Sequence, residues 1–186
     1  FDLRDYWIHL VCCHNYNRVS LVAEESIHMI TILTICLVAP FEFGIQPLAE
    51  DSKYRAEGFT KYTEMIAPNG KAIPIIAQKG VRDIAVARAR NLLKFFLTNV
   101  PNSKYGADKT AVANAMANNH AMLMMPEGAH REGKEPEIEA QPLFESETPV
   151  DGSKWYVKNN WDHRDAAFEE IFHLVHDTGI GTYMHG

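Results

Sequence analysis

Near the carboxyl end of the chain, residues 166–177 run Ala166-Ala167-Phe168-Glu169-Glu170-Ile171-Phe172-His173-Leu174-Val175-His176-Asp177. At about 100° per residue, the larger apolar residues fall on one side of a helix, with Leu174 at the margin of that side. These residues are Phe168, Ile171, Phe172 and Val175. The glutamates, the histidines and Asp177 fall on the other side, and Gly179 ends the pattern. The segment therefore predicts an amphipathic helix that packs on its phenylalanine-bearing side.

The polar side of this helix carries groups that bind metal ions in proteins. Glu169 and His173 are four residues apart, so their side chains lie one turn above each other and can chelate one cation. Glu170 projects beside them. His176, almost one turn further along, is an alternative imidazole ligand, and Asp177 could orient His173 by accepting a hydrogen bond. The same spacing also suits a solvated helix without a metal, because oppositely charged pairs four residues apart stabilise helices.

The pattern Glu169-Glu170-Ile171-Phe172-His173 resembles the H-E-x-x-H helix of zincin metallopeptidases, with glutamate in place of the first histidine. From about Tyr62 onward, the chain resembles an uncharacterised group of secreted bacterial zincin-like proteins. The resemblance is carried by Ala72-Ile73-Pro74-Ile75-Ile76-Ala77, by Met124-Met125-Pro126 and, most specifically, by residues 162–181. It implies a zincin-like fold with Glu170 as catalytic base, Glu169 and His173 as zinc ligands, and a peptide or protein substrate.

The glutamate ligand changes the expected metal chemistry. A carboxylate partly cancels the charge of the metal, so a bound water is less acidified than it is under neutral histidines. Oxygen ligation also widens the choice of metal towards iron or manganese. Gly179 stands where the metzincin pattern has its third histidine. We expect the third ligand beyond Gly186, in a domain that is truncated at its C-terminus.

Around the helix, the sequence predicts an α+β fold with a small mixed sheet and packed helices. Strands are expected at 72–78 and 121–125, and helices at 81–98, at 108–118 with Asp108 as N-cap, and at 54–66. Pro74 places its strand at a sheet edge or at a strand start. Residues 126–152 form a long acidic loop, which is either a solvated excursion or a lid beside a site.

The first 49 residues are expected to lie outside the main domain. Met29 is the first methionine, and it opens an apolar stretch of signal-peptide length. We therefore expect 1–28 to be non-native or upstream sequence, 29–49 to be a signal or anchor, and 50–186 to be the N-terminal part of the zincin-like domain. The alternative is a buried strand at 30–38. A signal would make the protein secreted or place it in the cell envelope.

Charge and composition narrow the function classes. The net charge is -6, so no basic stripe is available for a nucleic-acid backbone. No apolar run approaches the roughly 18 residues that a spanning helix needs. Nucleophile elbows, P-loops and dinucleotide fingerprints are missing from the sequence. A metallohydrolase is the first hypothesis. A non-catalytic extracellular binding or structural domain is the alternative, and an intracellular interaction module would require 30–38 to be a core strand.

Overall fold

The computed structural model describes residues 42–130, 136–150 and 164–181. Within these ranges the chain forms a five-stranded mixed sheet in the order β1-β2-β3-β4-β5. The strands are β1 (Gln46–Pro47), β2 (Phe59–Ile66), β3 (Ala72–Gln78), β4 (Leu123–Met125) and β5 (Gln141–Pro142). Pairing is antiparallel from β1 to β3 and parallel from β3 to β5. The expected α+β class with a small mixed sheet is confirmed.

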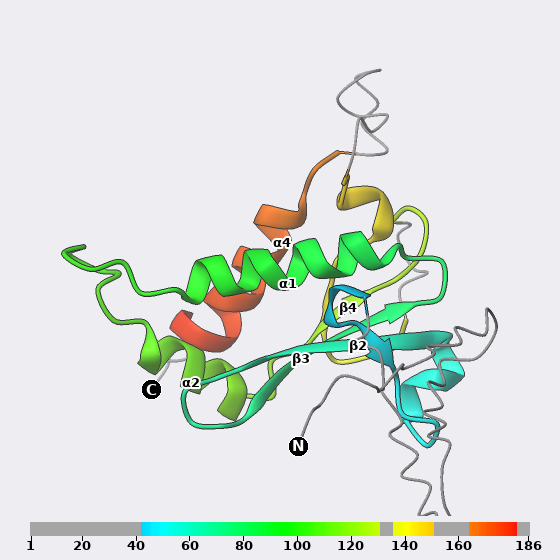
Figure 1. The fold of residues 1–186 in the computed structure, drawn as a ribbon, viewed down its shortest axis with the longest axis horizontal. Coiled ribbons are helices and arrows are strands. Elements are labelled where there is room, and N and C mark those ends of the chain that lie inside the picture. Colours follow the sequence, from blue (N-terminus) through cyan, green and yellow to red (C-terminus); the bar gives the residue numbers. More distant parts are fainter. Residues whose placement is uncertain (1–41, 131–135, 151–163, 182–186) are drawn as a thin grey trace, which may run out of the picture. The chain divides into compact units, whose positions relative to one another are not determined.

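Helices from three parts of the chain pack on one face of this sheet (Figure 1). Helices α1 (Asp83–Leu97) and α2 (Thr110–Asn118) connect β3 to β4, and α4 (Ala167–Val175) continues into a π-helical turn, η5 (His176–Ile180). The helices expected at 81–98 and 108–118 are therefore confirmed. The N-cap of α2 is Lys109 and not the expected Asp108, which lies one residue earlier and accepts a hydrogen bond from the Thr110 amide at 2.8 Å. The core between helices and sheet includes Ile73, Ile75, Leu93 and Leu123.

The helix expected at 54–66 is wrong. A short 3-10 helix, η2 (Lys53–Glu57), ends at Gly58, which has a φ of 81°, and strand β2 follows. The aromatic and β-branched residues between 59 and 63 favour a strand. A tight turn then pairs β2 with β3, and Gly70 adopts a φ of 80° in that turn. The turn signal at Pro68-Asn69-Gly70 therefore decides the conformation of the residues before it.

Strand β3 lies inside the sheet, between β2 and β4, so the sheet edge is the wrong one of the two expected positions, and Pro74 instead lies close to the start of its strand. Pro74 pairs with Glu64 on β2, whereas pairing with β4 begins at Ile75. Because Pro74 precedes the residues that face β4, its missing N–H leaves the parallel ladder intact. The second expected strand, 121–125, is confirmed over Leu123–Met125.

Part of the acidic segment 126–152 is built into the fold rather than structureless. It contains β5 and a 3-10 helix, η3 (Glu145–Glu147). Leu143, Phe144 and Thr148 are buried, and the Leu143 amide donates to the Met124 carbonyl at 2.9 Å. Charged residues outnumber apolar ones in this segment, so its composition alone does not indicate that some of its positions are buried.

The opposite face of the sheet carries a smaller apolar cluster. Its buried members are Leu48, Phe59, Ile76, Met122 and Met124. Expectations for 1–28 and 30–38, and most of those for 29–49, lie outside the described residues. Among the residues that are described, no helix is long and apolar enough to cross a membrane.

Candidate functional site

Helix α4 buries a face that is rotated from the predicted one, although Ile171 and Val175 belong to both. Ala167, Ile171, Leu174 and Val175 are buried, whereas Phe168 is 55% exposed and Phe172 is 45% exposed. The buried residues follow the i, i+4, i+7, i+8 spacing of a core-facing stripe. The two phenylalanines lie at the flank of this stripe.

The flanking phenylalanines contact α1 from the side. Their ring centroids lie 4.6 Å and 5.9 Å from that of Phe96. Phe172 is also 6.2 Å from the His176 ring. An aromatic flank on the α1 side therefore borders the exposed polar surface of α4.

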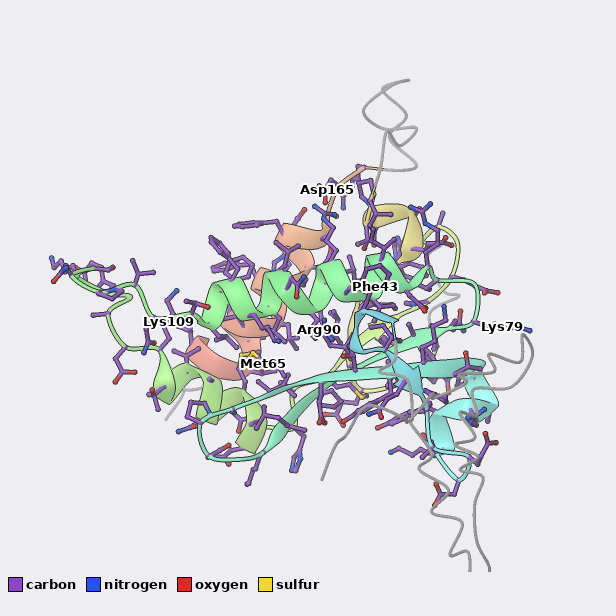
Figure 2. The ribbon with its side chains drawn as sticks, in the orientation of Figure 1. Phe43, Met65, Lys79, Arg90, Lys109 and Asp165 are labelled. Atoms are coloured by element: carbon purple, nitrogen blue, oxygen red, sulfur yellow. The ribbon has the colours of Figure 1, made fainter. Side chains whose placement is uncertain are left out.

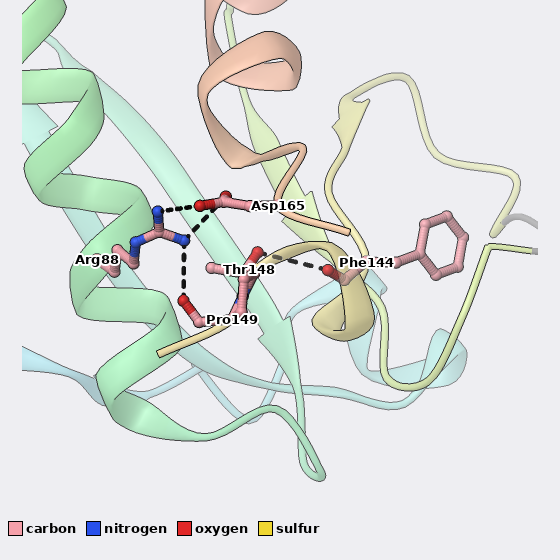
Figure 3. Close-up of polar contacts among 5 residues, drawn as sticks. All are labelled: Arg88, Phe144, Thr148, Pro149 and Asp165. Atoms are coloured by element: carbon pink, nitrogen blue, oxygen red, sulfur yellow. Dashed lines mark hydrogen bonds and ion pairs between the residues drawn. The ribbon is translucent and has the colours of Figure 1, made fainter. Parts of the chain in front are cut away.

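The start of α4 is fixed by an ion pair from α1 (Figure 3). Arg88 binds both carboxylate oxygens of Asp165, at 2.8 and 3.1 Å, and donates to the Pro149 carbonyl at 3.0 Å. The Ala166 amide donates to the Glu147 carbonyl at 3.0 Å. These contacts hold residues 147–149 against residues 165–166, so the first turn of α4 lies beside η3.

A second arginine of α1 binds the part of the fold around β2. Arg90, labelled in Figure 2, donates to the Thr63 hydroxyl at 2.9 Å and to the Gly44 carbonyl at 3.4 Å. It links α1 to β2 and to η1 (Glu42–Gly44). It therefore belongs to the scaffold on which α4 rests, not to the candidate site.

Glu170 is the most constrained acidic residue of α4. It is half-buried, and the Gln141 side-chain amide of β5 donates to its Oε2 at 2.8 Å. Burial raises the pKa of Glu170, and the nearby carboxylates of Glu147 and Glu169 raise it further. A carboxylate with a raised pKa and a fixed orientation has the properties of a general base.

Glu169 and His173 are exposed on the side that the sequence predicts. The nearest cation to Glu169 is Arg164, whose Nη1 lies 3.9 Å from Oε2. The pair therefore offers one oxygen donor and one nitrogen donor, which fits a borderline metal such as zinc, iron or manganese. A third ligand is not found among the described residues, because they contain no group of three histidine, cysteine, aspartate or glutamate side chains that could hold a metal.

The expected role of Asp177 does not hold. Its Oδ1 lies 2.7 Å from Nδ1 of His176, so it orients its neighbour rather than His173. His176 is exposed and lies where the α-helical pattern changes to the π-helical turn. The structure thus brings Glu169, Glu170 and His173 to one helix surface and gives His176 a separate partner.

Sequence analysis missed the residues that surround Glu170. Gln141 and Glu147 come from β5 and η3, and Arg164 precedes α4. A pocket of about 940 Å³, which Gln141 also lines, was not predicted either. These features depend on contacts between residues far apart in the chain, and no local pattern indicates them.

Comparisons with known proteins give no independent support for a family: no family model, no curated protein and no solved structure matches the chain.

Proposed function

We propose that this protein is a metal-dependent hydrolase that acts on peptide bonds. Glu169 and His173 would hold the metal, zinc in the first instance, and Glu170 would be the general base. The observation that carries the proposal is the hydrogen bond from Gln141, which fixes a half-buried carboxylate next to this pair of potential ligands.

The chemistry follows from the environment of each group. When bound, the metal supplies Lewis-acid polarisation of the scissile carbonyl. Glu170 takes a proton from the attacking water and later returns it to the leaving amine. Its raised pKa makes it a stronger base than an exposed glutamate, while Gln141 keeps one oxygen occupied and limits rotation of the carboxylate.

A metal titration of the full chain, combined with a peptide-hydrolysis assay, tests the proposal. We expect near-stoichiometric zinc, weakened at least about tenfold by His173→Ala. Glu170→Gln should retain the metal and lose about 10²–10⁴-fold in hydrolysis. His130→Asn is the matched control, because it removes an exposed histidine that lies outside α4 and does not line the pocket beside Gln141. Metal-free protein whose stability is unchanged by His173→Ala would contradict the proposal.

The second candidate is a non-catalytic extracellular binding or structural domain. It is favoured by the lack of a three-ligand group among the described residues. It predicts that Glu170→Gln leaves every measurable activity intact, so the same variant separates the two functions. A secreted or cell-envelope location is part of both proposals, and fractionation of expressing cells tests it.

A further inference from the structure

The pocket of about 940 Å³ adjoins the proposed catalytic base. Gln141 lines it and also donates to Glu170 at 2.8 Å. Leu174 and Asp177, from the part of the helix that follows Glu170, line it as well. A molecule bound in this pocket would therefore lie against the residue that orients the carboxylate.

The pocket has an apolar lining and a charged rim. The apolar part comes from β3, the residues before β4 and the segment before β5, and it includes Ala72, Pro74, Met122, Ile138 and Ala140. The rim carries four carboxylates, Glu57, Glu137, Glu139 and Asp177, against one lysine, Lys53. The carboxylates come from three separate segments of the chain, so their negative charge is distributed around the pocket.

We propose that this pocket binds a short, extended segment of the substrate polypeptide in which basic side chains alternate with apolar ones. The inference rests on the proposed function, because it makes the pocket the substrate site of that hydrolase. A volume of about 940 Å³ accommodates a ligand of a few residues. Carboxylates on separate segments complement several separated positive charges, and the apolar lining accepts the intervening side chains.

Fluorescence anisotropy with labelled octapeptides tests the proposal in the presence of EDTA, where no hydrolysis is required. The probes alternate lysine with leucine, lysine with serine, or glutamate with leucine. We expect the lysine–leucine peptide to bind at least about tenfold more tightly than the other two. Equal binding of the lysine–leucine and glutamate–leucine peptides, or of the lysine–leucine and lysine–serine peptides, would overturn the proposal.

Two double variants separate the pocket from the overall charge of the protein. Glu137→Gln/Glu139→Gln and Glu50→Gln/Asp51→Asn each remove two exposed negative charges, but only the first pair lines the pocket. We expect the first variant to weaken binding about fivefold or more and the second by less than about twofold. Equal weakening by both would overturn the pocket assignment. If the wild-type protein binds the lysine–leucine peptide but hydrolyses no peptide when zinc is supplied, only the proposed function is contradicted.

Discussion

At the scale of single residues, Glu170 is the proposed catalytic base and is also a residue whose negative charge destabilises the folded state. Burial first, and then the carboxylates of Glu147 and Glu169, raise its pKa in the folded protein. The folded state therefore holds this proton more tightly than the unfolded chain does. Its contribution to stability is present in full below the unfolded pKa and is lost as the pH rises through the folded pKa. The proposed catalytic carboxylate therefore destabilises the folded state at neutral pH.

Glu170→Gln removes that penalty and leaves an oxygen that can accept from Gln141. We expect the thermal midpoint at pH 7 to rise by about 1–3 °C, and the difference from wild type to shrink as the pH approaches 4. Thermal unfolding across this pH range measures both effects. Glu169→Gln is the control, because Glu169 is exposed on the same turn. A lower midpoint for Glu170→Gln than for this control at pH 7 would contradict the assignment.

The residues of the candidate site differ in how well the sequence predicts them. The spacing of Glu169, Glu170 and His173 places them on one helix surface, because a helix has a fixed period. Gln141 lies 29 positions from Glu170, and nothing in the local sequence links the two. Asp177 does not act as the expected partner of His173, because its carboxylate contacts the ring of His176 at the start of the π-helical turn.

At the scale of elements, the orientation of α4 is the feature on which the site depends. The sequence alone favours burial of phenylalanine, because it is larger than alanine and more apolar than its neighbours. The structure buries Ala167 and Leu174 together with the expected Ile171 and Val175, since small and aliphatic side chains let α4 approach the sheet closely. This rotation puts the aromatic flank on the α1 side and Glu170 on the β5 side.

Adjacent substitutions on α4 test this orientation. Ile171→Ala empties a fully buried position and should destabilise the protein by about 2–4 kcal/mol. Phe172→Ala removes a larger side chain that is 45% exposed and should cost about 1 kcal/mol or less. Denaturant unfolding of the two variants gives the comparison. A larger loss for Phe172→Ala would mean that the phenylalanine side faces the core, as the sequence predicts.

The contact between α1 and the start of α4 is a second property of the elements. Arg88 binds Asp165 through two nitrogens, and both side chains are mostly buried. Lysine cannot reproduce this geometry, so Arg88→Lys should destabilise the protein by about 1 kcal/mol and lower hydrolysis by displacing Glu169 and Glu170. Arg164→Lys is the control, because its contacts with Glu147 and Glu169 are 3.9–4.0 Å long and its own side chain is exposed. Equal losses in the two variants would show that the Arg88 pair does not position α4.

At the scale of the whole molecule, the fold class was predictable and the order of its parts was not. The periodicities of α1 and β3 identify them, because each is long and regular. The central place of β3 depends on β4, which follows some 45 residues later, so Pro74 alone could not decide between a sheet edge and a strand start. Residues 59–66 form a strand that pairs with β3, in line with the aromatic and β-branched residues at 59–63, a local preference that the expected helix at 54–66 overlooked.

Metal binding should be visible in the stability of the entire described domain. Helix α4 contacts α1, β5 and, through η5, α2, so its unfolding would remove contacts with three other elements. A ligand that binds only the folded state stabilises it by about 2.7 kcal/mol at a concentration 100 times its dissociation constant. For a chain of 186 residues, we expect zinc to raise the thermal midpoint by about 5–10 °C, reversibly with EDTA. His173→Ala should abolish the rise and His130→Asn should preserve it, whereas a rise that persists in His173→Ala would place the metal elsewhere in the molecule.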